Sequence, residues 1–118
     1  MKTRYADIAP FVTKDGSLIR ELMHPSQHGS SSMSLAEALI APLATTLMHL
    51  HRNSEEIYHV TQGTGNMRLG SAEFGVRRGD TIRIPPGTPH NVTNTGAGAL
   101  IILCVSHPAY SDEDTALR

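Results

Sequence analysis

The regular spacing of turns between short strand-like runs limits the possible folds of this chain more than any other feature. After Pro42, runs of about four to eight residues rich in aliphatic and β-branched side chains alternate with turns that contain Gly or Pro. No long helical stripe interrupts them, and this pattern is typical of a β-sandwich or β-barrel. The sequence therefore predicts an all-β fold, with strands within 45–51, 56–61, 66–69, 72–76, 81–84, 90–93 and 100–106.

The N-terminal part continues the β pattern. An Asp15-Gly16 turn separates Phe11-Val12 from residues 17–23, which predicts a hairpin. The segment His24–Ser32 is rich in Ser, Pro and Gly and is expected to form a mobile loop. Residues 33–41 have a helix-forming composition, but the proline that follows and the surrounding strands favour a strand.

A length of 118 residues is enough for one domain and too short for two. Within it we expect N-terminal strands and a loop that pack on the barrel over 1–32, and the β-barrel itself over 33–107. The remaining residues, 108–118, are polar and are expected to form a loosely attached tail.

Two histidines in the run 45–51 indicate a metal site. Because side chains alternate across a strand, His49 and His51 share one face and lie about 7 Å apart along the chain. Both imidazoles can therefore reach one ion. A glutamate that returns on the next strand, from the pair Glu55-Glu56, would be a third ligand.

A further histidine follows a rigid turn. Pro85 and Pro86 restrict φ and Gly87 permits a tight reversal, so the start of the next strand, with His90, is held in a fixed place. A metal site benefits from such pre-organisation.

These residues resemble the two sequence motifs of the cupin family. In the first motif, Gly-x5-His-x-His-x3–4-Glu-x6-Gly, the matching residues are His49, His51, Glu56 and Gly63. The spacing to Gly63 selects Glu56 rather than Glu55 as the ligand. The opening glycine of the motif would fall at Leu43, where this chain departs from the pattern.

The second motif, Gly-x5-Pro-x-Gly-x2-His-x3-Asn, is matched in full by Gly79, Pro85, Gly87, His90 and Asn94. The resemblance implies a cupin-type jelly roll, or double-stranded β-helix barrel. It also implies that one divalent metal ion is bound inside by His49, His51, Glu56 and His90. Such a ligand set tolerates Fe, Mn, Ni, Co, Cu or Zn.

The resemblance implies a metal-dependent enzyme that acts on a small oxygen-rich metabolite, such as a sugar derivative or an organic acid. It would be an isomerase or lyase that uses Lewis-acid polarisation, or a mononuclear non-haem iron dioxygenase. The alternative is a protein that binds a small molecule through the metal without catalysis. Tyr58, on the Glu56 face, and Arg83 are candidate catalytic residues. The alternatives are that Tyr58 is a buried tyrosine with a structural role and that Arg83 is exposed to solvent.

Charge and composition limit the other partners. The net charge is −1 with no block of like charges, so neither nucleic acid nor an anionic membrane is expected to bind. No apolar run approaches the roughly 20 residues of a membrane span, and the N-terminus lacks the apolar segment of a signal peptide. The single cysteine, Cys104, has no intramolecular partner, which favours a cytoplasmic location.

The run Leu100–Val105 is apolar on both faces. A strand of this kind has to be covered on both sides. The second cover is either the N-terminal strands or another subunit, and we expect a homodimer.

Overall fold

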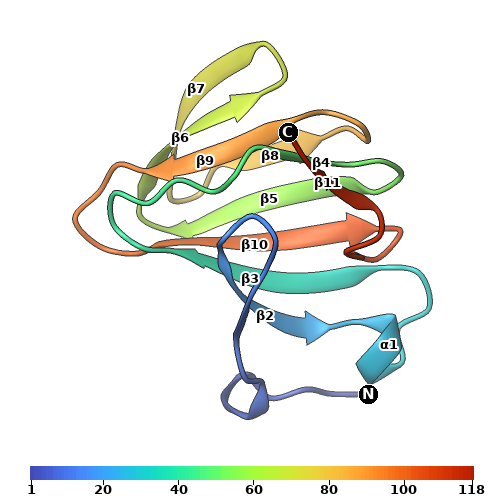
Figure 1. Ribbon diagram of the computed structural model, residues 1–118. Coiled ribbons are helices and arrows are strands. Elements are labelled where there is room, and N and C mark those ends of the chain that lie inside the picture. The colour runs from blue at the N-terminus through green and yellow to red at the C-terminus, as the bar shows by residue number, and fades with distance from the viewer.

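The computed structural model describes residues 1–118 and contains two antiparallel sheets that face each other around one core (Figure 1). The first sheet contains, in spatial order, β1 (Phe11–Val12), β2 (Leu18–Met23), β3 (Ser34–Ile40), β10 (Leu100–His107), β5 (Glu55–Gln62) and β8 (Thr81–Ile84). The second contains β11 (Thr115–Leu117), β4 (His49–His51), β9 (His90–Asn94), β6 (Thr64–Leu69) and β7 (Ala72–Arg77). The expected all-β jelly roll is confirmed.

Aliphatic side chains from the inner faces of both sheets form the core. The most deeply buried are Val60, Met67, Ile84, Leu100 and Ile102, each at most 2% exposed. On β10 the residues between them point outward and are partly exposed, as the alternation of a strand requires. Part of the space between the two sheets is a cavity, lined by residues of β2, β3, β4, β5 and β10 among others.

A buried asparagine ties the strand ends together on one side of the barrel. The Nδ2 atom of Asn94 donates to the carbonyls of Ile40 and Gly98 at 2.9 and 2.8 Å, and Oδ1 accepts from the Gly96 amide at 2.9 Å. The side chain is fully buried, so these bonds satisfy groups that water cannot reach. This explains in physical terms why the second motif ends on an asparagine.

The segment expected to be a mobile loop contains a short helix, α1 (Pro25–His28). Its ends carry recognisable signals: the His24 side chain accepts a hydrogen bond from the Ser26 amide, Pro25 occupies the first turn, and Gly29 closes the helix with φ of 93°. The other helix is a single 3-10 turn, η1 (Tyr5–Asp7), and neither has the length and apolar character needed to cross a membrane.

The expectation of a loosely attached tail is wrong. Strand β11 pairs with β4 along its length, with Thr115 opposite His51 and Leu117 opposite His49. Thr115 is 4% exposed. The tail has few apolar residues, but its backbone completes the edge of the second sheet, and Figure 1 shows it crossing beside β4.

Strand β4 is shorter than the predicted run 45–51 because pairing is interrupted at Leu47. Before this point Thr45 still forms a bridge with Thr93, and the Thr46 amide donates to the Val92 carbonyl at 3.0 Å. The amide of Leu47 donates to the carbonyl of Asp15 at 2.8 Å, in the turn between β1 and β2, instead of to a neighbouring strand. This bond brings the Asp15 turn over the edge of the second sheet, beside His49.

Leu43 occupies the glycine position of the first motif and keeps the conformation that glycine favours. Its φ is 66°, in the left-handed region, and its side chain is 83% exposed. At the other end of the motif Gly63 has φ of 91°, and a β-carbon there would lie 2.7 Å from the Ala99 carbonyl oxygen. The backbone of the motif is therefore retained although one of its glycines is replaced.

We predict that Leu43→Gly raises the free energy of unfolding by about 0.5 to 1 kcal/mol, because it relieves a left-handed residue whose side chain makes no buried contacts. Urea denaturation followed by circular dichroism measures the change. Leu43→Ala keeps the β-carbon and should change stability by less than about 0.5 kcal/mol. A loss of stability in Leu43→Gly would contradict the assignment of strain to this position.

Candidate metal centre

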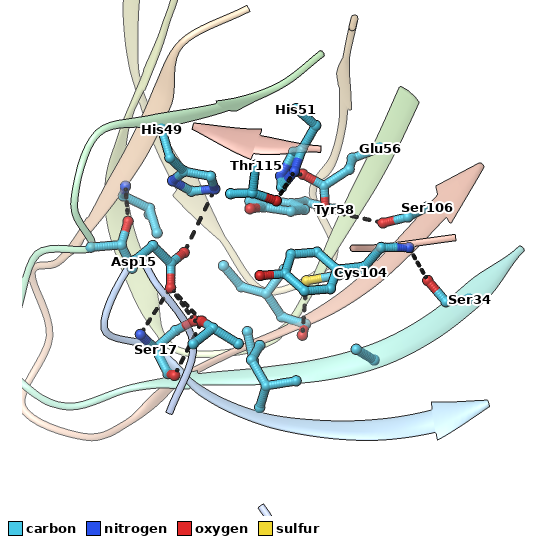
Figure 2. A pocket seen from close by; sticks show the side chains of 18 of the residues that line it. Asp15, Ser17, Ser34, His49, His51, Glu56, Tyr58, Cys104, Ser106 and Thr115 are labelled. Carbon is cyan, nitrogen blue, oxygen red and sulfur yellow. Dashed lines mark hydrogen bonds and ion pairs between the residues drawn. The ribbon is translucent and has the colours of Figure 1, made fainter. Parts of the chain in front are cut away.

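Four buried side chains from three strands converge at one point. His49 and His51 come from β4, Glu56 from β5 and His90 from β9, and one potential ligand atom from each lies within 4.8 Å of all the others. Direct pairing places His90 opposite His49, and the two-residue repeat of β4 adds His51 on the same face. Glu56 reaches the group from the first sheet, and Figure 2 shows its carboxylate beside His51.

Hydrogen bonds to backbone carbonyls set the tautomers of two histidines. Nδ1 of His49 lies 2.8 Å from the Leu47 carbonyl, and Nδ1 of His90 lies 2.9 Å from the Thr88 carbonyl. A carbonyl only accepts, so each Nδ1 carries the proton. The Nε2 lone pairs of both rings therefore face the centre of the cluster.

The third histidine is oriented by the C-terminal strand. Nδ1 of His51 lies 3.0 Å from Oγ1 of Thr115, and that hydroxyl donates its own proton to the Ser111 carbonyl at 2.8 Å. Thr115 is thus the acceptor, and His51 also presents an Nε2 lone pair. Partners of this kind fix the orientation of metal-binding imidazoles in proteins.

The geometry fits a cation. Oε1 of Glu56 lies 2.7 Å from Nε2 of His51 and 3.5 Å from Nε2 of His90, yet both Oε1 and the His90 Nε2 are buried without a hydrogen-bond partner. The other carboxylate oxygen accepts from Oγ of Ser106 at 3.3 Å. Lone pairs that face one another at this distance are stabilised by a positive ion between them, and nitrogen and oxygen donors suit a divalent transition metal.

The protonation states agree with metal binding, which requires deprotonated ligands. Burial alone would raise the pKa of Glu56, but the adjacent His51 and His90 outweigh it and lower the pKa to about 2. Burial, together with the nearby His90, lowers the pKa of His49 and keeps its ring neutral. At neutral pH Glu56 is therefore ionised and the His49 ring is neutral.

A further carboxylate lies on the open side of the cluster. Oδ1 of Asp15, in the turn between β1 and β2, accepts from Oγ1 of Thr13 at 2.8 Å and from the amide and hydroxyl of Ser17 at 2.9 and 2.6 Å. Oδ2 makes none of these bonds and lies 3.7 Å from Nε2 of His49 (Figure 2). Asp15, His49, His51 and Glu56 line one cavity.

The two other residues selected from the sequence have different positions. Tyr58 lines the cavity, with its ring 5.9 Å from that of His90, and burial raises the pKa of its hydroxyl well above the usual range, so the group stays protonated. Arg83 is 64% exposed and pairs with Glu55 at 2.6 Å on the outer face of the first sheet. Arg83 does not reach the cavity, and no catalytic role follows for it.

Several residues of the cavity wall were not identified from the sequence. They are Asp15, Glu21, Tyr110 and Thr115. Asp15 was recognised only as part of a turn, and Glu21 as part of a strand. For Tyr110 and Thr115 the sequence has no local signal, because their positions depend on distant segments. The Tyr110 amide donates to Oγ of Ser34 at 3.0 Å, and Thr115 pairs with His51.

The sequence model of the cupin domain matches residues 36–106 of this chain. An uncharacterized protein of Methanocaldococcus jannaschii, MJ1618, is 50% identical over 117 residues, which cover 99% of this chain and 94% of that protein.

Solved structures share the fold. Oxalate decarboxylase of Lactobacillus farciminis, in its formate complex, aligns with 95% of this chain at a TM-score of 0.81 and 25% identity. This chain spans only 34% of that protein. KdgF from Halomonas aligns over 96% of this chain and 98% of its own length at a TM-score of 0.80, and its 15% identity supports likeness of fold alone.

We predict that Thr115→Val lowers affinity for a divalent ion about 10- to 100-fold, because it removes the acceptor that orients His51 while keeping the volume of the side chain. His51→Ala should abolish tight binding. Competition of zinc-loaded protein with a chromogenic chelator measures both effects.

Thr95→Val, at an exposed position, serves as the matched control and should bind zinc like the unaltered protein. Stoichiometric zinc retained in His51→Ala would rule out this site. Unchanged affinity in Thr115→Val would show that the tail does not orient the ligand.

Proposed function

This chain belongs to the cupin family, and we propose that it is a divalent-metal-dependent enzyme that acts on a small organic acid. The observation that carries the proposal is that three of the four clustered side chains line a cavity instead of being enclosed by protein on every side. A closed structural site has no use for such an opening, whereas a catalytic site keeps a position for its ligand.

The charge of the ion and its four ligands, with Asp15 not included, favours an anion at the ion. A divalent ion with one carboxylate and three neutral imidazoles has a net charge of about +1 (+2 − 1). When bound, the ion supplies Lewis-acid polarisation of a carbonyl or carboxylate oxygen. Likeness to an oxalate decarboxylase in complex with formate supports a small carboxylic acid as the ligand.

The residues beside the cluster can hold and move a proton. Oδ1 of Asp15 is occupied by three hydrogen bonds, so Oδ2, 3.7 Å from the His49 ring, is the oxygen free to take a proton from a bound acid. The protonated hydroxyl of Tyr58 is available as a donor on another wall of the cavity. We therefore favour the lyase or isomerase route over the oxygenase route, which does not need these groups.

The alternative is metal-assisted binding of a small molecule without turnover. It requires only the four-ligand cluster and the cavity beside it, and no group that transfers a proton. Iron-dependent oxygenation remains the second enzymatic route.

We predict that the manganese-loaded protein catalyses the exchange with deuterated water of the α-hydrogen of a small α-hydroxy acid, or of the C3 hydrogens of a small α-oxo acid. Proton NMR measures the exchange. Asp15→Asn should slow the exchange about 10²- to 10⁴-fold and leave the manganese content unchanged, because it removes the base but no ligand. Asp7→Asn, at an exposed position, is the control.

The outcomes separate the functions. Acids that bind without exchange in the unaltered protein favour the non-catalytic alternative. Oxygen consumption by the iron-loaded protein, without exchange, favours the oxygenase. If no acid of either class binds, the proposed function is wrong.

We also propose that the protein is a homodimer that pairs through the outer face of the first sheet. On that face Ile57 and Val105 lie directly opposite each other and are 41% and 36% exposed. The N-terminal strands extend the sheet at its edge and leave this face open. Of the preceding residues, Tyr5 packs near β3, where its hydroxyl donates to Glu37 at 2.6 Å.

Ile57→Lys is expected to convert the dimer to a folded monomer, because it places a charge beside Val105 in the apolar part of this face. Size-exclusion chromatography with light scattering measures the mass. Leu43→Lys, at an exposed position of the β3–β4 connection, should leave the dimer intact. A monomeric unaltered protein, or a dimeric Ile57→Lys, would contradict this interface.

A further inference from the structure

A second buried carboxyl group lies in the cavity and has no partner. Glu21, on β2, is 6% exposed, and its Oε2 is buried without a hydrogen bond. It lines the same cavity as His49 and Glu56. Burial raises the pKa of its carboxyl above the usual range.

The nearest basic side chains, His24 and Arg20, form hydrogen bonds to other groups. His24 places Nε2 2.7 Å from the Tyr110 carbonyl, and its Nδ1 accepts from the Ser26 amide, so neither nitrogen is free. Arg20 points to the opposite face of β2, where it donates to the Ile8 carbonyl and the Tyr5 hydroxyl. The protein therefore supplies no donor to Glu21.

The sheet aims Glu21 at the space in front of the metal centre. Glu21 lies opposite Ala36, Ala36 opposite Cys104, and Cys104 opposite Tyr58, so these side chains share one face. Three strand spacings put the α-carbons of Glu21 and Tyr58 about 14 Å apart, and side chains on the concave face of a curved sheet converge. The cavity thus has the metal centre on one wall and Glu21 on another.

The backbone beside Glu21 is irregular. The register between β2 and β3 shifts between Glu21 and Met23, so Leu22 is a bulge. The Leu22 carbonyl accepts a hydrogen bond from Oγ1 of Thr3 at 2.7 Å, which holds the bulge in place. Bulges re-aim side chains and are frequent next to active sites.

We propose that Glu21 binds the end of the ligand that is remote from the metal centre, by accepting a hydrogen bond from a hydroxyl group. The ligand is then a hydroxylated carboxylic acid, with one end at the four-ligand cluster and a hydroxyl at Glu21. This inference rests on the proposed function for the position of the acid end.

The energetics favour a binding role over a structural one. A buried polar group without a partner destabilises the folded protein, whereas a hydroxyl donated by a ligand satisfies it. Groups that lower stability and face a cavity are characteristic of binding sites, where function is retained at the expense of stability.

The first test needs no ligand. Glu21→Met keeps the volume of the side chain and removes the unsatisfied oxygen, so it should raise the melting temperature of the zinc-loaded protein by roughly 5 °C. Glu113→Gln, at an exposed position, is the control and should not change it. A lower melting temperature in Glu21→Met would mean that Glu21 has a structural partner, and the proposal would be overturned.

The second test uses matched acids. Lactate and glycerate have the same carbon skeleton and the same chelating end, and glycerate adds one hydroxyl. Erythronate is longer and reaches a more distant carboxyl. Calorimetric titration of the zinc-loaded protein should show about tenfold tighter binding of a hydroxylated acid than of lactate. Glu21→Met should abolish this preference and leave lactate binding and zinc content unchanged, and Glu21→Gln, which keeps an acceptor oxygen, should retain part of it.

The result distinguishes two failures. If lactate binds to the unaltered protein but the hydroxylated acids bind no better, or if Glu21→Met keeps the preference, the role of Glu21 is wrong and the proposed function stands. If none of the acids binds to the unaltered protein, the proposed function fails, and this inference fails with it.

Discussion

The site depends on the protons held at the outer nitrogens of three imidazoles. Once Nδ1 of each ring donates outward, three Nε2 lone pairs and one carboxylate must share a small space. For His49 and His90 the acceptor is the carbonyl two residues earlier, so the entry of each strand orients its own histidine. For His51 the acceptor is Thr115, and the C-terminal strand becomes part of the site. A barrel that lacked β11 would leave one imidazole without a fixed orientation.

Local pattern explains what could be predicted from the sequence. Alternation along a strand places His49 and His51 on one face, and the turn before His90 fixes its position, so both could be predicted from neighbouring residues. The choice of Glu56 needed the spacing known from the family. Thr115 could not be found, because its contact with His51 joins residues 64 positions apart and depends on a strand too short to have a pattern. The strands around the core were predicted for the same local reasons, and α1 was missed because end-capping contacts stabilise it.

The proposed ion ligands and several other residues around the cavity come from different parts of the chain. Every proposed ion ligand lies inside the family match, residues 36–106, whereas Asp15, Glu21 and Tyr110 lie outside it. The walls that would contact an organic ligand are thus contributed partly by segments that the family pattern does not describe. A shared ion site therefore carries little information about the ligand, which is the general relation between a fold and its functions.

Two buried carboxyl groups in one cavity have opposite surroundings. Glu56 is surrounded by imidazoles, which lower its pKa to about 2, so it is ionised and ready for a cation. Oε2 of Glu21 has no hydrogen-bond partner, the neighbouring His24 and Arg20 are hydrogen-bonded to other groups, and burial raises the pKa of the Glu21 carboxyl. If both groups served only to stabilise the fold, the second would be better replaced by an apolar side chain of the same volume. The cavity is therefore polarised, with one end suited to an anion at a metal ion and the other to a neutral donor, and a ligand that matches both ends binds in a single orientation.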